Sequence, residues 1–194
     1  MIKNIKFNHA DPESIKDERL VSWSYNVLPH LKNLSKPEIQ NYCKQNSKPY
    51  GVLMENLLGD FNFASVIRSA NAFGAEKIFY YGKKKFDRRG ACGTHHYVNL
   101  NFFDTFEDVL SLKEEYTFVA LENVSRTSYL HEFSWDTPKK PLIILGEEGS
   151  GISQQMLDLC DHQIEIKQLG SVPSVNAAVA ASIAMSDLLS KRFL

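Results

Sequence analysis

Hydrophobic and polar positions alternate in blocks along the chain from residue 50 onward. Short, almost wholly apolar runs are typical of buried strands, whereas apolar residues three and four apart are typical of helices. The apolar runs predict strands at residues 50–54, 77–81, 117–121, 141–145 and 163–166. The helical spacing predicts helices at residues 62–74, 105–115, 153–160 and 174–192. Strands that alternate with helices predict an α/β fold with a mostly parallel sheet.

The segment before residue 49 has a different pattern. It is polar and helical in character, and Ser35, Pro37 and Glu38 together are typical of a helix start. No internal repeat or low-complexity stretch marks a further unit. We therefore expect residues 1–48 to form a short helical N-terminal extension and residues 49–194 to form one α/β domain.

Composition and charge narrow the functional classes. The chain has 194 residues and is 43% hydrophobic, so a core can form, and its net charge of −1 gives no global attraction to nucleic acid. Its three cysteines are widely spaced, without a C-x-x-C pair, which argues against a disulfide framework or a zinc site. We expect reduced thiols in a cytoplasmic protein, no metal, no membrane span and no secretory signal.

The stretch PLIILGEEGSGI, residues 141–152, is a buried strand followed by a glycine-rich acidic loop. Ligands of α/β folds bind beyond the carboxyl ends of the strands, where this loop lies. It lacks the lysine of a phosphate-binding loop and the spacing of a dinucleotide fingerprint, and Glu147 and Glu148 would repel phosphate. The loop suits a cationic ligand or one that donates hydrogen bonds. The alternative is a plain turn whose carboxylates face water or cap the next helix.

Two further stretches carry candidate chemistry. In the helix at 62–74, the residues Phe63, Val66, Ile67, Ala70 and Phe73 share one face. Arg68 is nearly opposite that face, so it points away from the sheet and is either a solvated arginine or a functional one. The stretch GSVPSVNAAVAA, residues 170–181, places Ser174 and Asn176 at the start of an alanine-rich helix, which Ser174 could simply cap.

Together these stretches resemble the three motifs of the SpoU (TrmH) branch of the SPOUT methyltransferases. Asn62 followed by Arg68 is similar to the first motif, LGEEGSGI to the second and SVNAAVA to the third. The resemblance covers residues 50–194. It implies a parallel α/β sheet with helices on both faces and a C-terminal trefoil knot, an exception to the usual absence of knots. It also implies a homodimer that transfers a methyl group from S-adenosylmethionine to a ribose 2'-hydroxyl of tRNA or rRNA.

The resemblance also implies roles for individual residues. Arg68 matches the catalytic arginine, which we expect to stabilise the attacking oxygen, because arginine is normally always protonated. Asn62 would orient the arginine or a substrate phosphate, and Glu148 would anchor the arginine or the knot. Ser174 and Asn176 complete the expected catalytic set. The expected cofactor-binding residues are Leu121, Gly146, Glu147, Gly151, Ile166, Ser174, Val175 and Asn176.

RNA binding requires local positive charge, because phosphate contacts dominate affinity. The segment at 81–100 supplies it together with aromatic residues, and it follows a predicted strand near the expected site. We expect RNA contacts from Lys83, Lys84, Lys85, Arg88 and Arg89, the alternative being a solvated loop. His95 and His96 either touch RNA or pack.

Departures from the family pattern keep other readings open. Lys167 stands where many relatives have a proline, and residues 1–48 are too short for the RNA-binding domain that some relatives carry. One alternative is a non-catalytic RNA-binding protein with the same fold. Another is an unrelated nucleotide-binding α/β domain, against which the missing phosphate motifs count.

Overall fold

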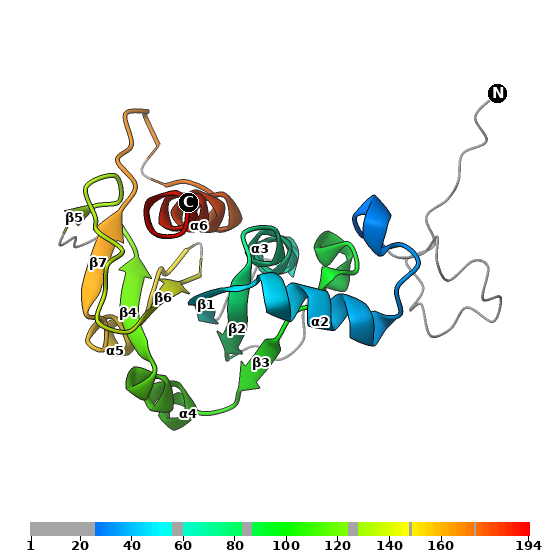
Figure 1. Cartoon of the computed structure of the whole chain (residues 1–194). Coiled ribbons are helices and arrows are strands. Elements are labelled where there is room, and N and C mark those ends of the chain that lie inside the picture. Colours follow the sequence, from blue (N-terminus) through cyan, green and yellow to red (C-terminus); the bar gives the residue numbers. More distant parts are fainter. Residues whose placement is uncertain (1–25, 56–59, 83–86, 124–127, 148, 173) are drawn as a thin grey trace.

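The computed structural model of this chain describes most of the residues after the first 25 (Figure 1). The described ranges are 26–55, 60–82, 87–123, 128–147, 149–172 and 174–194. Glu148 and Lys83, Lys84 and Lys85, which the sequence nominates as functional, lie outside them.

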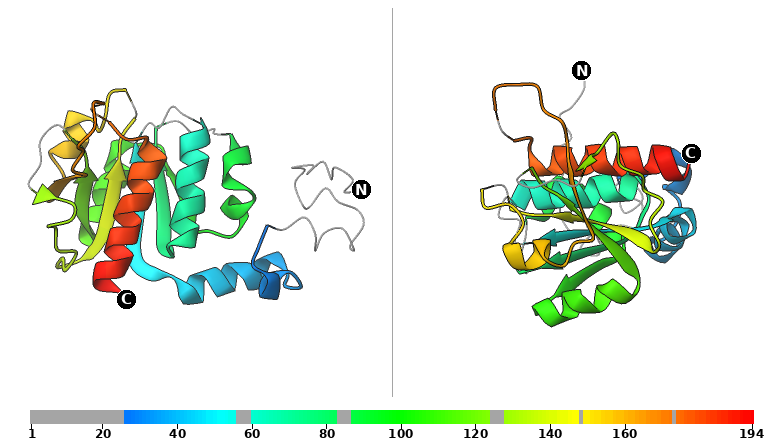
Figure 2. Two further views of the ribbon diagram at one scale, coloured as in Figure 1. Left: turned by 90° about the horizontal axis from the view of Figure 1, so that it is seen from above. Right: turned by 90° about the vertical axis from the view of Figure 1, so that its left-hand side faces the viewer.

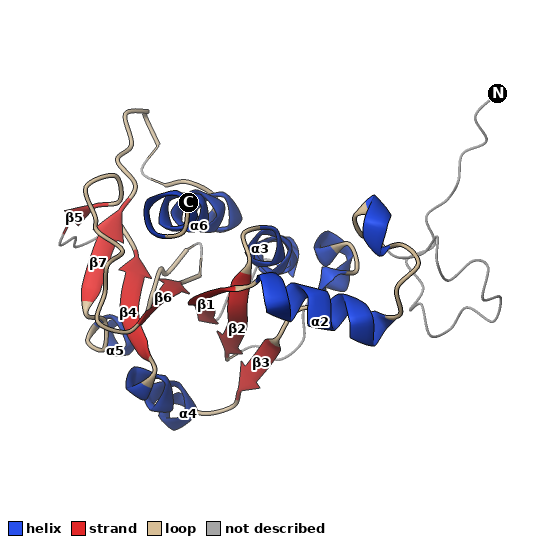
Figure 3. Cartoon of the chain, viewed as in Figure 1, coloured by secondary structure: helices blue, strands red, loops and turns tan. Residues whose placement is uncertain are grey.

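In this part of the chain, seven strands form one sheet in the order β3-β2-β1-β6-β4-β7-β5, and the paired strands are parallel (Figure 3). The strands are β1 (Lys48–Glu55), β2 (Ala75–Tyr81), β3 (Leu100–Phe103), β4 (Tyr116–Leu121), β5 (Ser128–Tyr129), β6 (Lys140–Leu145) and β7 (His162–Glu165). The α-helices are α2 (Lys36–Asn46), α3 (Asp60–Ala72), α4 (Phe106–Ser111), α5 (Gln154–Leu157) and α6 (Ala177–Arg192). Short 3₁₀ turns are η2 (Pro29–Leu31), η3 (Arg88–Ala91), η4 (Thr94–His96) and η5 (Leu112–Glu114).

Helices cover both faces of the sheet, with α3 and α6 side by side on one face and α4 and α5 on the other (Figure 2). Successive side chains of a strand point to opposite faces. Val52 and Ile143 therefore belong to the core beneath α3 and α6, and Leu53 and Ile144 to the core beneath α4 and α5. Burial on both faces explains why the central strands are continuous apolar runs.

The parallel arrangement brings the carboxyl ends of four neighbouring strands to one edge of the sheet. Met54 of β1 pairs with Leu145 of β6, Ala120 of β4 with Ile144, and Leu121 with Ile164 of β7. The loops that leave β4, β6 and β7 therefore begin next to one another. This edge is where a ligand site is expected in an α/β fold.

Most sequence-based expectations for the elements are confirmed. A capping box joins Ser35 and Glu38 at the start of α2, and Gly74, with φ of +71°, follows α3. The strands β3 and β5 were not expected, and α4 ends at Ser111 and continues as a 3₁₀ turn. Both strands are too short to show a repeating pattern of apolar residues, so the sequence did not predict them.

Candidate functional site

A cavity of about 590 Å³ lies at the edge where β4, β6 and β7 end. It is lined by the first residues after these strands, by the loop that precedes α5 and by the start of α6. The structure brings together around it the eight residues expected to bind cofactor: Leu121, Gly146, Glu147, Gly151, Ile166, Ser174, Val175 and Asn176. Their role in cofactor binding stays a prediction. The structure does show that these residues, which come from four separate segments of the chain, lie around one cavity.

The loop at 146–152 is folded tightly on itself. The backbones of Glu147 and Gly151 exchange two hydrogen bonds, with N–O distances of 3.1 and 2.8 Å. A Cβ atom on Gly146 would lie 2.1 Å from the carbonyl carbon of Gly151. Gly151 itself has φ of +71°, and a Cβ atom there would lie 2.5 Å from Oε2 of Glu122. Glycine is required at both positions, so the loop presents backbone rather than side chains to part of the cavity.

Carboxylates hold this loop in place. Ser150 donates its N–H and its hydroxyl to Oε2 of Glu147, at 2.7 and 2.6 Å. These hydrogen bonds, with one from the N–H of Gly149, lower the pKa of Glu147. Glu122, at the end of β4, accepts the N–H of Ile152 at 3.0 Å. Glu147 therefore stays ionised at neutral pH, although part of its hydrogen-bonding capacity is used within the loop.

The electrostatic character of the cavity follows from its lining. Glu122 and Glu147 both line it, and none of the described lining residues is a lysine or an arginine. Leu121, Leu145 and Ile166 add apolar walls. A cationic or hydrogen-bond-donating ligand fits this lining, whereas a polyphosphate does not.

Glu55 supports the far end of the loop, a role that the sequence did not reveal. It is the last residue of β1 and is only 3% exposed. Its carboxylate accepts the N–H of Ser153 at 2.9 Å and the hydroxyl of Ser153 at 2.7 Å. Ser153 also caps α5, since its hydroxyl oxygen accepts the N–H of Met156. The only available signal was a glutamate that closes an apolar strand, and its partner is 98 positions away.

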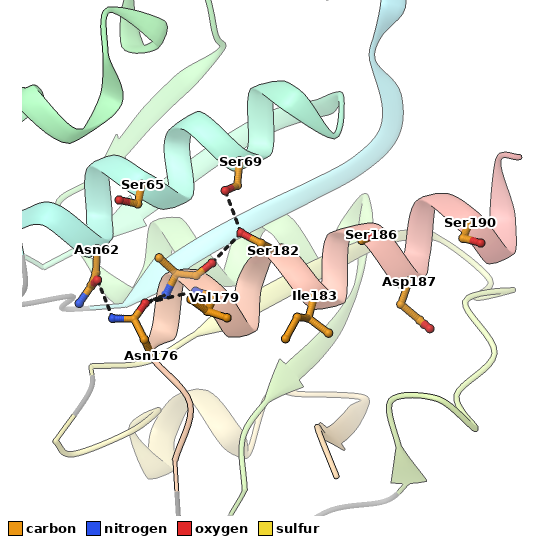
Figure 4. Close-up of a pocket in the computed structure, with 11 residues that line it drawn as sticks. Asn62, Ser65, Ser69, Asn176, Val179, Ser182, Ile183, Ser186, Asp187 and Ser190 are labelled. Atoms are coloured by element: carbon orange, nitrogen blue, oxygen red, sulfur yellow. Dashed lines mark hydrogen bonds between the residues drawn. The ribbon is translucent and has the colours of Figure 1, made fainter. Parts of the chain in front are cut away.

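Asn176 connects two of the motifs. Its side-chain oxygen accepts the N–H groups of Ala178 and Val179, so Asn176 caps α6, and the expectation that Ser174 caps this helix is wrong. Its side-chain nitrogen donates to Oδ1 of Asn62 at 2.9 Å (Figure 4). Asn62 belongs to the first turns of α3, so this bond ties the start of α3 to the start of α6. The structure thus joins Asn62 to Asn176, not to Arg68.

A second cavity, of about 740 Å³, runs along the outer side of α3 and α6 and shares Asn176 with the first (Figure 4). Small residues dominate its walls, and the hydroxyl of Ser182 donates to that of Ser69 at 2.8 Å. Val179 and Ile183 of α6 line it and are 49% and 40% exposed. This second cavity is therefore an open groove lined by small and apolar side chains, and the backbone of another molecule could approach it closely.

Arg68 lies apart from both cavities. It is exposed on the side of α3 away from the sheet, as its helical position predicts, and its Nη1 donates to Sγ of Cys92 at 3.4 Å. Among the described residues, it is not part of the lining of either cavity. The structure of one chain therefore does not bring Arg68 together with the residues around the first cavity.

The described part of the basic segment is built on η3 and η4. Arg88 and Arg89 are exposed, and Arg89 is paired with Asp87 through its Nε, at 2.7 Å from Oδ2. The rings of His95 and His96 lie 4.0 Å apart. Within the described ranges, no group of three His, Cys, Asp or Glu residues is arranged to hold a metal ion, and no helix is long and apolar enough to cross a bilayer.

Comparison with known proteins identifies the family. The model of the SpoU rRNA Methylase family matches residues 49–186, and the chain therefore belongs to the SpoU family of RNA methyltransferases. The chain is 26% identical over 147 residues to a putative TrmH family tRNA/rRNA methyltransferase of Staphylococcus haemolyticus, covering 73% of this chain and 58% of the relative. It is 24% identical over 159 residues to the tRNA (guanosine(18)-2'-O)-methyltransferase of Aquifex aeolicus, covering 79% and 75%. It spans only 40% of an uncharacterized tRNA/rRNA methyltransferase of Synechocystis.

Solved structures agree with this assignment at the level of the fold. The TrmH/SpoU tRNA modifying enzyme of A. aeolicus superposes with a TM-score of 0.71 at 23% identity, covering 81% of this chain and 82% of that one. The SpoU methyltransferase AviRb of Streptomyces viridochromogenes, in complex with AdoMet, superposes with a TM-score of 0.68 at 24% identity, covering 75% and 58%.

Proposed function

We propose that this protein is a homodimeric enzyme that methylates a ribose 2'-hydroxyl of tRNA or rRNA with S-adenosylmethionine. The observation that carries the proposal is the cavity at the ends of β4, β6 and β7, where the second and third motifs of an RNA methyltransferase family meet. Its volume of about 590 Å³ falls within the range of small-molecule sites. The A. aeolicus and AviRb proteins, a 2'-O-methyltransferase by name and an AdoMet complex respectively, support the choice of acceptor and cofactor.

The cavity fits S-adenosylmethionine in its chemistry. Gly146, Gly151 and the residues after β4 and β7 would hold the nucleoside through their backbone groups, since the glycines allow close approach. Glu122 and Glu147 would favour the positive charge of the cofactor. When bound, the cofactor supplies an electrophilic methyl group on a sulfonium.

The remaining chemistry belongs to the protein and the RNA. In the proposed transfer the ribose oxygen would bond to the methyl carbon, the electrons of the broken carbon–sulfur bond would stay on the sulfur, and the hydroxyl proton would pass to water. We assign to Arg68 the stabilisation of the negative charge that develops on this oxygen, because a guanidinium stays protonated and cannot easily act as a base. Asn62 and Asn176 would orient the acceptor at the mouth of the cavity, where their side chains are joined.

The homodimer is proposed because a single chain leaves the site incomplete. Arg68 lies outside the cavity, while the groove between α3 and α6 adjoins the cavity at Asn176 and exposes Val179 and Ile183. A second copy packed on this groove would cover its apolar side chains and bring the partner's arginine towards the cavity. We also propose a trefoil knot in this region, where Ser174, Val175 and Asn176 line the cavity directly before α6, which packs on β4 and β6.

The test is methyl transfer from labelled S-adenosylmethionine to unmodified total tRNA and, separately, to rRNA. Wild type is compared with Arg68→Ala and Arg68→Lys, and nuclease mapping locates the label. We expect label on a ribose 2'-oxygen, lost in both variants because lysine lacks the planar guanidinium. Cofactor binding without transfer to either RNA would favour the non-catalytic RNA-binding alternative. Failure to bind the cofactor would refute the proposal.

We also place the enzyme in the cytoplasm, where its free cysteines would stay reduced.

A further inference from the structure

An aromatic side chain stands exposed at the start of α3. Phe61 is 60% exposed although it directly precedes Asn62, which is joined to Asn176, a residue that lines both cavities. The residues of the first motif that follow it either pack in the core or make polar contacts, whereas most of the Phe61 side chain is exposed. A single exposed aromatic residue is common and needs no explanation by itself. The residues around Phe61 give this one its interest.

The ring of Phe61 is covered in part by a guanidinium that is held in place. The guanidinium carbon of Arg89 lies 5.5 Å from the centre of the ring, within the range of a cation–π contact. Nε of Arg89 donates to Oδ1 and Oδ2 of Asp87, at 3.0 and 2.7 Å. The hydrogen bonds from Arg89 lower the pKa of Asp87, so the pair stays ionised at neutral pH.

The backbone fixes this pair of side chains relative to each other. A Cβ atom on Gly90 would lie 2.9 Å from Cβ of Ala64 and 3.2 Å from the carbonyl oxygen of Phe61, so η3 is pressed against the first turn of α3. The hydroxyl of Ser65 donates to the same carbonyl at 2.7 Å. The backbones that carry Phe61 and Arg89 are therefore held against each other, which limits how far the two side chains can separate.

This surface lies on the same stripe of α3 as Arg68. Residues seven apart on a helix fall on one side, separated by about 10 Å along the axis at about 1.5 Å per residue. The chain of η3 follows this stripe, with Arg89 over Phe61 at one end and Cys92 at Arg68 two turns later. A ring and a cation are thus presented about 10 Å from the arginine assigned to the ribose oxygen, a distance that about three stacked nucleotides of one strand cover at about 3.4 Å each.

We propose that Phe61, together with Arg89, is a stacking platform for a nucleobase within a few nucleotides of the methylated position of the RNA. The inference rests on the proposed function, in which Arg68 acts on that nucleotide. An exposed aromatic ring next to Arg89, which follows a second exposed arginine in η3, suits a base with its phosphates better than it suits an apolar protein surface. Because every base has a stacking face, the platform would add affinity while showing a preference for strongly stacking purines.

The test compares binding of oligoadenylate and oligouridylate of equal length, which carry the same charge but stack differently. Wild type should bind oligoadenylate more tightly. Phe61→Ala should weaken that binding about 5- to 100-fold and remove the difference between the two oligonucleotides. Phe61→Trp should keep both the affinity and the preference. Leu110→Ala, which truncates a 40% exposed side chain on the opposite face of the sheet, is the matched control and should change neither.

Four outcomes would overturn the proposal. The first is binding by Phe61→Ala within twofold of wild type. The second is no binding of either oligonucleotide by wild type. The third is an equal loss for both oligonucleotides, which would assign the effect to charge. The fourth is dissociation of a dimer by Phe61→Ala in sedimentation, which would make the ring a contact between copies. A wild type that binds with the expected preference but methylates no RNA would refute the proposed function and leave the platform standing.

Discussion

Replacing Gly146 by alanine tests whether the conformation of the loop at 146–152 creates the cofactor site. The added Cβ atom would lie 2.1 Å from the carbonyl carbon of Gly151, 2.2 Å from the nitrogen of Ile152 and 2.3 Å from the oxygen of Gly151. Non-bonded carbon atoms pack at about 3.5–4.0 Å, so the overlap exceeds about 1 Å. All three neighbours are backbone atoms, and no side-chain rotation can relieve the clash.

The expected size follows from the cost of overpacking, about 1–3 kcal/mol. The loop can relieve the clash by moving to a conformation that does not bind the cofactor. The apparent affinity is then reduced in proportion to the fraction of molecules whose loop stays in the binding conformation. Gly146→Ala should therefore bind S-adenosylmethionine about 5- to 150-fold more weakly, measured by isothermal titration calorimetry.

Gly149 provides a control within the same loop. A Cβ atom there would meet the Glu147 carboxylate at 3.4 Å, an ordinary contact with a side chain that can move, so Gly149→Ala should change the affinity by about twofold or less. Binding by Gly146→Ala within twofold of wild type, with an unchanged melting temperature, would refute the reasoning. A wild type that does not bind at all would count against the proposed function instead.

Three further predictions concern stability, each measured by urea denaturation. Glu55→Ala should lower the free energy of unfolding by about 3 kcal/mol, because it removes a buried carboxylate that accepts two hydrogen bonds from Ser153; a loss below about 1 kcal/mol would contradict this role. Asn176→Ala should lose about 1 kcal/mol with the cap of α6, whereas Asn176→Asp keeps an acceptor and should lose less than half of that; equal losses would show that the cap is not the cause. Hydrogen bonds from Lys140 and then Lys77 lower the pKa of Glu115, so its stabilising contribution is present above its unfolded pKa of about 4.3 and is lost as the pH falls through the lower folded value. Glu115→Gln should therefore make the free energy of unfolding less dependent on pH in that acidic range. If the free energies of the variant and the wild type instead change in parallel with pH, Glu115 does not make this contribution.

The sequence predicted those parts of the fold that depend on local patterns. The central strands are buried on both faces, so each is an apolar run that can be recognised without its neighbours. The glycines of the loop at 146–152 are also a local signal, because close approach and positive φ select this residue type. Since parallel strands end at one edge, these signals were enough to place the eight nominated residues around one cavity.

The other features of the fold and the site depend on contacts between segments far apart in the sequence. A single sequence shows no pattern from which such contacts can be predicted. Glu55 and Ser153 are 98 positions apart, and Asn62 and Asn176 are 114 apart. Ser174 and Asn176 are both good capping residues two positions apart, so spacing alone could not choose between them. Two-residue β5 exists only because β7 offers an edge to pair with.

The separation of Arg68 from the cavity leads to a prediction about subunits. If the arginine of one chain serves the cavity of the other, two inactive variants can complement each other. Arg68→Ala keeps the cavity and loses the arginine, whereas Gly146→Ala keeps the arginine but leaves its cavity mostly empty when the cofactor concentration is held well below the weakened Kd of this variant. In an equal mixture that exchanges subunits freely, half of the dimers are mixed and each holds one complete site, so methylation should return to about a quarter of the wild-type rate.

The control is a mixture of Arg68→Ala with the double variant that carries both changes. No dimer in that mixture contains an intact arginine, so no activity should return. If the arginine instead serves the cavity of its own chain, every chain in the first mixture lacks one half of its site, and that mixture should stay as inactive as the control. Recovery in the first mixture alone would therefore require an active site shared between two copies, whereas absence of recovery after demonstrated subunit exchange would refute it.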